Sequence, residues 1–469
     1  MLFPTIQFAI FFVVVLTANW LLLPHRRQWK LFMLGASYFF YGSWDWRFVF
    51  LIIASTLVNQ AAVVMMSRND DPRRRKLIVA LGVAANLGVL GWFKYYGFFV
   101  SSLINMFRPL GIDLPLPLLE ITLPVGISFF TFQALSYVID NYRGNETPAP
   151  LLDFAVYLAF FPQLVAGPIV RSSEFLPQLY TPKDPRRVDA GRGFSLIAGG
   201  LFKKVVVANT LAGAIVDPFF ASPSQFTALE ALAAIYGYAV QIYADFSGYT
   251  DIAIGVALLM GFKFPDNFNQ PYTAISIQDF WRRWHMTLSR WLRDYLYIPL
   301  GGNRRGRAAT YRNLMVTMVL GGLWHGAAWT FVIWGAFHGD LLAGERWLGE
   351  RRTVAVEDTP GRRAIRRLAT FHLVCLGWVL FRADSMARVG EILGRFFEWG
   401  PAPAVTPAVL ALIAGGIAVQ YLPTDFRLQI QAGFSRLRPV AMTAVLAVFL
   451  LLLDGLGPEG VAPFIYFQF

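Results

Sequence analysis

Long apolar stretches recur along the whole chain and constrain its fold more than any other feature. The first, from about Phe3 to Leu23, is long enough to cross the roughly 30 Å hydrocarbon layer of a membrane. Only 15% of the residues are charged, against about 25% in soluble domains. Backbone polar groups inside a membrane need internal partners, and a helix provides them within one segment. We therefore expect an all-α polytopic membrane protein.

The apolar segments predict about 11 transmembrane helices. Because no long polar stretch separates them, we expect a single membrane domain over residues 1–469. Residues 227–260 are long enough for either one tilted helix or two passes. The apolar segment 29–41 is short for a full span. The predicted spans are 3–23, 46–66, 77–99, 118–140, 151–170, 194–217, 227–260, 310–335, 368–383, 404–422 and 438–455.

The net charge of +12 does not indicate a nucleic-acid partner, because Lys and Arg cluster in short loops between apolar segments. Cytoplasmic loops of membrane proteins carry such an excess of positive charge. The loops His25–Lys30 and Arg68–Lys76 should therefore both be cytoplasmic. This orientation places the N-terminus outside and requires residues 31–66 to cross out and back. The basic loop 343–368 is expected to be another cytoplasmic connection.

Residues 276–300 differ in pattern from the apolar spans. If they form one helix, tryptophans and leucines make a stripe on one face and arginines lie opposite. This distribution is typical of a cytoplasmic helix in the plane of the membrane interface. His285 falls at the edge of the buried face, so its side chain should point into protein or lipid. Simple packing of His285 against tryptophans would give the same pattern.

The chain has only five histidines, and His325 lies in the otherwise apolar stretch GGLWHGAAW (321–329). An ionisable side chain inside a membrane marks a functional site by default. The neighbouring glycines permit close approach of a ligand, or tight packing of helices, which is their commoner use. His338 would face another side of a continuous helix, so we interpret it as a packing residue. His25 and His372 are expected to be exposed or interfacial.

Several enzyme classes lack support in the sequence. The chain has no nucleophile elbow GxSxG, no phosphate loop, no HExxH and no EF-hand. Its one cysteine, Cys375, excludes a disulfide framework. No metal is expected, although Asp245, Asp251 and Asp279 remain open as ligands beside the histidines. A neutral buried histidine acting as general base on a hydroxyl is the remaining chemistry.

Seven motifs follow one another along nearly the whole chain: ISFFTFQALSYVIDNYRG (127–144), FPQLVAGPIVR (161–171), QIYADFSGYTDIAIG (241–255), NFNQPY (267–272), FWRRWHMTLSRWLRDYLYIPLGGNRRG (280–306), GGLWHGAAWTFVIWGAFHG (321–339) and PFIYFQF (463–469). With these motifs the chain resembles the membrane-bound O-acyltransferase family, and within it the type that O-acetylates alginate. The resemblance implies helices around a central tunnel, an acyltransferase activity and a place in the bacterial inner membrane.

The resemblance also implies roles for two histidines. The family's active-site histidine falls on His325, within the segment 310–339, and its second polar position falls on His285. His285 would orient a substrate or steady the developing oxyanion. The donor would be acetyl-CoA or a related thioester from the cytoplasm, with no other cofactor. Acetyl would pass to a periplasmic acetyltransferase partner, or to an exopolysaccharide directly.

Four further residues are candidates for substrate binding: Trp324, Arg282, Arg283 and Asn269. Arginines on and after residues 276–300 would attract the phosphates of coenzyme A. Anchoring at a negatively charged membrane surface is the alternative explanation for most of these arginines.

Two other functions stay open at this stage. A D-alanyl transferase of cell-wall polymers would share several of the motifs, whereas YIPLGGNRRG and the ending FIYFQF favour the acetylation type. The second is a non-enzymatic acyl or lipid transporter. Paired inverted repeats with broken helices would favour that interpretation, and the sequence contains no such repeats.

Overall fold

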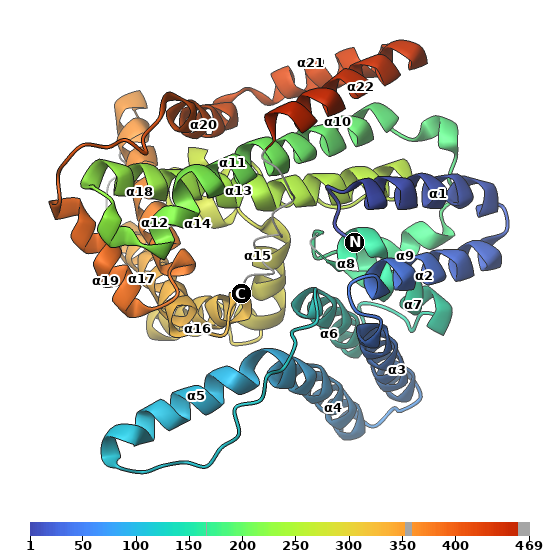
Figure 1. Ribbon diagram of the computed structural model, residues 1–469. Coiled ribbons are helices and arrows are strands. Elements are labelled where there is room, and N and C mark those ends of the chain that lie inside the picture. Colours follow the sequence, from blue (N-terminus) through green and yellow to red (C-terminus); the bar gives the residue numbers. More distant parts are fainter. Residues whose placement is uncertain (166, 352–358, 458–469) are drawn as a thin grey trace. The chain divides into compact units, whose positions relative to one another are not determined.

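The computed structural model describes residues 1–165, 167–351 and 359–457, and within these ranges the regular structure is helical without strands (Figure 1). Five helices in these ranges are long and apolar enough to cross a membrane. They are Arg47–Ser67, Pro72–Leu110, Ala190–Ala221, Ala228–Leu259 and Pro360–Arg382. The protein is therefore an all-helical, multi-pass membrane protein.

The chain divides into two compact units. Unit 1 comprises Met1–Asp189 with Val256–Pro265, and unit 2 comprises Ala190–Gly255 with Asp266–Phe469. The motif PFIYFQF (463–469) and the middle of the basic loop 343–368 lie outside the described residues.

In unit 1, two of the helices begin at side-chain caps that the sequence encodes. The Thr5 hydroxyl accepts a hydrogen bond from the Phe8 N–H at the start of α1, and Asp71 caps α4 just before a proline. The helices are α1 (Ile6–Leu22), α2 (Arg26–Gly42), α3 (Arg47–Ser67), α4 (Pro72–Leu90), α5 (Tyr96–Phe107), α6 (Ile127–Arg143), α7 (Leu151–Ala159), α8 (Phe161–Leu164) and α9 (Ser172–Tyr180).

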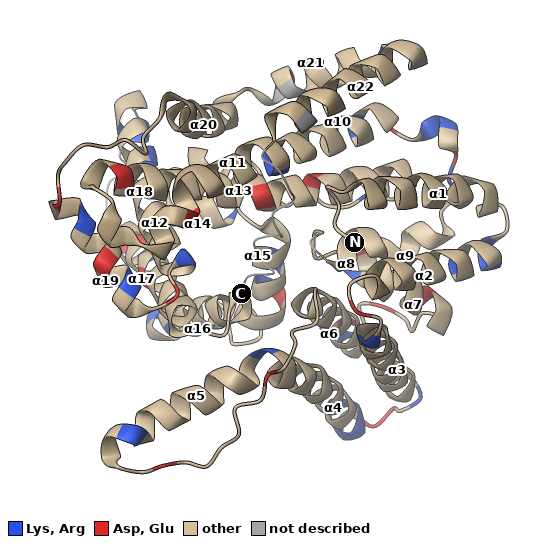
Figure 2. Ribbon diagram, viewed as in Figure 1, with Lys and Arg blue, Asp and Glu red and all other residues tan. Residues whose placement is uncertain are grey.

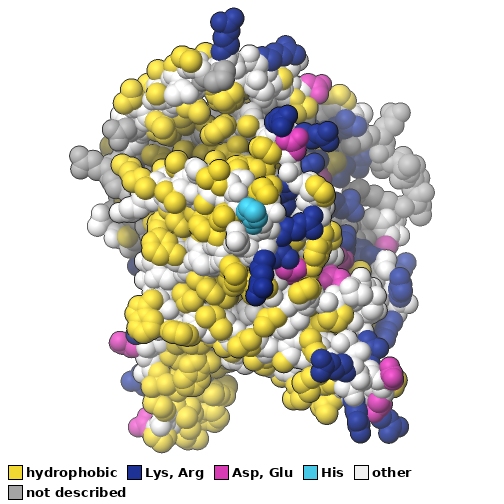
Figure 3. Space-filling model, turned by 90° about the vertical axis from the view of Figure 1, so that its right-hand side faces the viewer, with side chains coloured by type: hydrophobic (Ala, Val, Ile, Leu, Met, Phe, Trp, Pro, Cys, Tyr) yellow, Lys and Arg dark blue, Asp and Glu magenta, His cyan; other side chains and the backbone are white. Residues whose placement is uncertain are grey.

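The two basic loops of unit 1 lie beside the same connection, between α6 and α7. Lys30 pairs with Asp153 at the start of α7, and the Arg75 guanidinium donates to the Tyr142 carbonyl at the end of α6. Helices α2 and α3 cover residues 31–66 apart from the turn between them, and the crossing out and back stays a prediction. Figure 2 shows Lys and Arg at the start of α2 and α4. On the side of the molecule drawn in Figure 3, hydrophobic side chains cover much of the surface.

Unit 2 contains most of α13 (Ala228–Leu259), whose residues from Val256 onward belong to unit 1. Its other helices are α10 (Ala190–Leu201), α11 (Asn209–Leu211), α12 (Asp217–Ala221), α14 (Ile277–Trp281), α15 (Met286–Leu292), α16 (Arg307–His325), α17 (Trp329–Arg351), α18 (Pro360–Arg382), α19 (Met386–Gly394), α20 (Pro407–Ala418), α21 (Thr424–Ser435) and α22 (Pro439–Leu456). Residues 227–260 thus hold one helix of 32 residues rather than two passes.

Glycines bring α10 and α13 into close contact. A Cβ atom on Gly200 would lie 2.6 Å from the Gly248 carbonyl oxygen, and one on Gly255 would lie 2.6 Å from the Gly193 carbonyl oxygen. Small residues at such crossings are typical of membrane helices, because they let backbones approach. The close contact fixes α13, which carries residues that face the candidate site.

Two predicted spans turn back on themselves. Residues 310–335 were predicted as one span, but α16 ends at His325 and α17 starts at Trp329. Within 151–170, α7 ends at Ala159 and the separate short helix α8 follows. Both breaks consist of apolar residues, with Phe160 and Gly326 buried, so hydropathy alone does not reveal them.

Candidate functional site

His325 is the last residue of α16, at a turn enforced by glycine packing. A Cβ atom on Gly322 would lie 2.2 Å from the Phe331 carbonyl oxygen, and one on Gly335 would lie 2.3 Å from the Met318 carbonyl oxygen. Helices α16 and α17 therefore cross with their backbones in contact. A Cβ atom on Gly326 would lie 2.0 Å from the Phe331 ring. The glycines of this motif serve the packing that positions His325.

Aromatic side chains from three helices surround the imidazole of His325. Its ring centre lies 4.9 Å from that of Trp324, and 5.2 Å from those of Trp334 and Phe381. His325 is 4% exposed. The rings meet edge to face, an arrangement that fixes the orientation of the imidazole.

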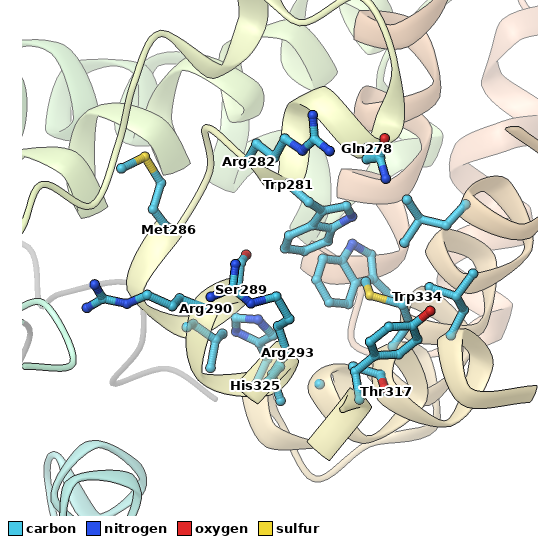
Figure 4. Close-up of a pocket in the computed structure, with 17 residues that line it drawn as sticks. Gln278, Trp281, Arg282, Met286, Ser289, Arg290, Arg293, Thr317, His325 and Trp334 are labelled. Atoms are coloured by element: carbon cyan, nitrogen blue, oxygen red, sulfur yellow. The ribbon is translucent and has the colours of Figure 1, made fainter. Parts of the chain in front are cut away.

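His325 lies on the wall of a cavity of about 440 Å³, a size typical of ligand sites (Figure 4). Residues Leu314 to His325 of α16 line one side, a length of about 16 Å along the helix. Trp281 and Trp334 pack against each other in the same wall, with ring centres 5.7 Å apart. The cavity is therefore an elongated, mainly apolar pocket with one histidine at its side.

Arginines and a few hydroxyl groups provide the polar lining of this pocket. Arg282, Arg290 and Arg293 line it, together with Ser289 and Thr317 (Figure 4). Arg293 also pairs with Asp294. Guanidinium groups recognise phosphate and carboxylate oxygens through paired hydrogen bonds. An apolar pocket with arginines in its lining suits a long, mainly apolar ligand that ends in an anionic group.

His285 lies in the turn between α14 and α15, and its side chain is completely buried. Its imidazole centre is 6.5 Å from that of His325, and the Phe246 ring stands perpendicular to it at 4.7 Å. Its backbone φ of +42° is in the left-handed region, which costs energy for a residue other than glycine. Burial lowers the pKa of His285 to about 3, so its imidazole is neutral at physiological pH.

The turn at His285 overturns the prediction of one helix over 276–300. Helix α14 ends at Trp281 and α15 begins at Met286. The chain leaves the helix because the Met286 N–H donates to the Asn267 carbonyl rather than to a preceding turn. The expected burial nevertheless holds on both sides of the break, since Trp284 and Leu288 are each 1% exposed.

The four substrate-binding candidates lie in different surroundings. Arg282 lines the pocket, and Trp324 packs against both histidines. Arg283 pairs with Asp279 and donates to the Asn269 carbonyl. Asn269 itself is exposed. Neither Arg283 nor Asn269 lines the pocket.

Asn267 is a contact of His285 that the sequence did not indicate. Its side-chain oxygen is 3.2 Å from His285 Nδ1. The motif NFNQPY contains two asparagines, and only the folded chain shows which one faces the histidine. Trp334 and Phe381 were also missed, because they reach His325 from later helices.

The remaining acids and histidines have other neighbours. Asp245 pairs with Lys204, Asp251 with Lys203 and Asp279 with Arg283. These three carboxylates therefore each face a cation. His338 is fully buried beside Trp281 and Trp334, as expected of a packing residue. The Tyr236 hydroxyl lies 2.7 Å from Nε2 of the exposed His372.

Comparison with known proteins places this architecture in a family. The model of the membrane-bound O-acyltransferase family matches residues 125–366, which include both histidines. The chain belongs to the membrane-bound O-acyltransferase family. It is therefore an acyltransferase, and its resemblance to that family at the level of motifs is confirmed.

Similarity to individual proteins indicates which reactions of the family are relevant to this chain. The chain is 38% identical over 475 residues to the probable alginate O-acetylase AlgI of Pseudomonas putida, covering 95% of this chain and 96% of that protein. It is 37% identical to the peptidoglycan O-acetyltransferase of Helicobacter pylori, covering 78% and 73%. It is 30% identical to the teichoic acid D-alanyltransferase of Bacillus subtilis, covering 55% and 68%. These similarities support O-acetylation of polymers.

Proposed function

We propose that the protein takes an acetyl group from a cytoplasmic acyl donor, acetyl-CoA or a related thioester, and transfers it across the bacterial inner membrane. The acetyl group then serves O-acetylation of an exported polysaccharide such as alginate, by way of a periplasmic partner. The observation that carries the proposal is His325 on the wall of an apolar pocket that is also lined by arginines.

In the proposed reaction, His325 acts as the general base. An acceptor hydroxyl oxygen attacks the thioester carbonyl while its proton passes to the imidazole. A new ester bond forms, the carbon–sulfur bond breaks, and the thiolate leaves and takes the proton back from the imidazolium. Aromatic rings around His325 exclude water, which reduces competing hydrolysis of the thioester.

The pocket lining suits the chemistry of the proposed donor. Its apolar length along α16 would accommodate a thioester arm. Arg282, Arg290 and Arg293 in the lining would bind the phosphates of such a donor. The donor would therefore place its carbonyl beside His325 and its charged part at the arginines.

The choice of a polymer as the final acceptor is supported by the names of the similar proteins. The Pseudomonas and Helicobacter proteins are named for acetylation of two different polymers, and acetyl transfer is what they share. A D-alanyl transferase is the second candidate, but the match to the Bacillus protein covers a smaller part of this chain at lower identity. A transporter without chemistry would not need a base in the pocket.

The decisive experiment uses the full-length protein in lipid vesicles with radiolabelled acetyl-CoA outside. We expect label to appear in an added periplasmic acetyltransferase or in alginate, and to disappear with His325→Ala. The same vesicles with labelled D-alanine on a carrier thioester should show no transfer. Uptake of intact donor without acyl transfer would overturn the proposal in favour of a transporter, and D-alanyl transfer would overturn it in favour of the second candidate.

A further inference from the structure

One oxygen atom organises the turn that carries His285. The side-chain Oδ1 of Asn267 is 3.2 Å from His285 Nδ1, 3.1 Å from the Thr287 N–H nitrogen and 2.9 Å from the Thr287 hydroxyl. The Asn267 carbonyl accepts a further bond from the Met286 N–H, at 2.9 Å. Asn267 and Thr287 are 1% and 2% exposed. A single buried asparagine therefore holds three successive residues of the turn.

These contacts identify the atom that faces the imidazole. A backbone N–H can only donate, so the Asn267 atom that meets Thr287 N–H is the amide oxygen and not the amide nitrogen. An amide oxygen can only accept. His285 Nδ1 must then carry a hydrogen and donate it to Asn267. A neutral imidazole has only one N–H, so Nε2 carries a lone pair.

We infer that Asn267 is a positioning residue, which holds His285 in the Nδ1–H form so that Nε2 accepts a hydrogen bond from the reacting hydroxyl. The inference rests on the proposed acyl transfer. It also chooses between the two roles open for His285. A neutral imidazole whose only N–H is occupied by Asn267 has nothing to donate to an oxyanion, whereas its lone pair can orient a hydroxyl for attack.

The surroundings leave the imidazole little freedom to reverse this arrangement. The Phe246 ring stands perpendicular to it at 4.7 Å, and the Trp324 ring centre lies 5.9 Å away. The imidazole of His325, a titratable group on α16, has its ring centre 6.5 Å away. A half-turn of the ring would place the carbon Cδ2 at Asn267 and lose the hydrogen bond, and it would require these neighbours to move. The strained backbone at His285 is thus maintained by the bonds from Asn267.

The first test is the tautomer itself. Full-length protein labelled with ¹⁵N-histidine is studied by long-range ¹H–¹⁵N NMR, and His285→Gln assigns the signals. We expect the His285 signals of the Nδ1–H tautomer in the wild type, and a mixture of tautomers in Asn267→Leu. An Nε2–H tautomer in the wild type would overturn the inference. This measurement does not depend on activity, so a wild type that transfers no acetyl group would disprove the proposed function alone.

The second test is kinetic and uses Asn267→Asp. The carboxylate can accept the same three bonds, so the turn is retained, but its charge stabilises protonated His285 and raises its pKa. We expect the acidic limb of the kcat profile to move to higher pH, with activity lost toward acidic pH and returning to the wild-type level as pH rises. Asn267→Leu should lower kcat at every pH and leave the KM for acetyl-CoA nearly unchanged.

Thr287→Val is the matched control, because it removes one donor to the same oxygen but keeps the backbone bond and the imidazole bond. We expect its pH profile to match the wild type. If Thr287→Val and Asn267→Leu reduced kcat equally with no change of tautomer, Asn267 would be a structural residue only and the inference would be wrong.

Discussion

His285 and His325 lie with their imidazole centres 6.5 Å apart, and the indole of Trp324 packs against both. His325 closes α16, whereas His285 lies in the turn before α15. Only His325 lines the pocket. In the proposed reaction, His325 would therefore face the acyl donor as general base, and His285 would orient the acceptor hydroxyl through Nε2.

His325→Ala should abolish acetyl transfer while the protein remains folded in the membrane. Loss of a general base costs about 10²–10⁴-fold in rate. Incorporation of label from acetyl-CoA measures this, and size-exclusion behaviour in detergent checks folding. His372→Gln is the control, because that histidine is exposed and bonds Tyr236 away from the pocket. Near wild-type transfer by His325→Ala would disprove its role.

Each of Arg282, Arg290 and Arg293, changed to Gln, should raise the KM for acetyl-CoA about two- to five-fold, since partly solvated charges contribute about 1 kcal/mol or less. Acetyl-pantetheine, which lacks the nucleotide phosphates, should show no such change. Arg388→Gln, on α19, is the control because Arg388 pairs with Glu391 instead. Equal effects on both donors would show that these arginines do not bind phosphate.

Gly322→Ala should destabilise the protein strongly, because the added Cβ would lie 2.2 Å from a backbone oxygen. Overpacking of this kind costs about 1–3 kcal/mol. The control is Gly344→Ala in α17, where nothing lies within 4 Å of the new atom. Thermal unfolding in detergent should show a lower Tm for Gly322→Ala only. Equal Tm values would mean that α16 and α17 are not in backbone contact.

The fold class could be predicted from the sequence, because apolar length directly reflects the thickness of the membrane. The turn after His325 could not, since its residues Gly326, Ala327 and Ala328 are as apolar as the helices that they join. The break at His285 was hidden for another reason. The stripe of tryptophans continues through it, while the bonds that cause it come from Asn267, 18 residues earlier.

Only part of the candidate site could be predicted from the sequence. The motifs pointed to both histidines, and Arg282 does line the pocket. Arg283 and Asn269 lie in two different motifs, and their contacts are mainly with each other and with Asp279. A motif records which residues occur together, whereas the direction of each side chain depends on turns that the motif does not encode.

The buried ion pair between Lys204 and Asp245 should stabilise unit 2, with Nζ and Oδ1 2.7 Å apart and side chains 2% and 4% exposed. Lys204→Met removes the cation beside a buried carboxylate and should cost about 3–5 kcal/mol, whereas Lys204→Met with Asp245→Leu should recover much of the loss. The neighbouring Lys203→Met is the control, because its pair with Asp251 is 23% and 28% exposed. Unfolding by denaturant in micelles measures all three variants.

If the double variant were no more stable than Lys204→Met, the two side chains would not be coupled. The pair also bears on the site, because the residue after Asp245 is Phe246, whose ring stands against His285. Acetyl transfer by the double variant should therefore fall even where its stability recovers, if the pair helps to hold that ring.

Glu146, in the connection between α6 and α7, should make stability depend on pH. Its carboxylate accepts a bond from the buried Ser172 hydroxyl, at 2.9 Å. Burial, and then the charge of Asp140, raise the pKa of Glu146 to about 7. Between its ordinary pKa of about 4.5 and this value, the folded state binds more protons than the unfolded state, so stability falls as pH rises through 7.

Glu146→Gln keeps an oxygen for Ser172 and removes the charge. Its Tm should exceed that of the wild type at pH 8 and match it at pH 5, whereas the exposed Asp113→Asn should show no such dependence. A Tm difference between Glu146→Gln and the wild type that stays the same at both pH values would contradict the raised pKa.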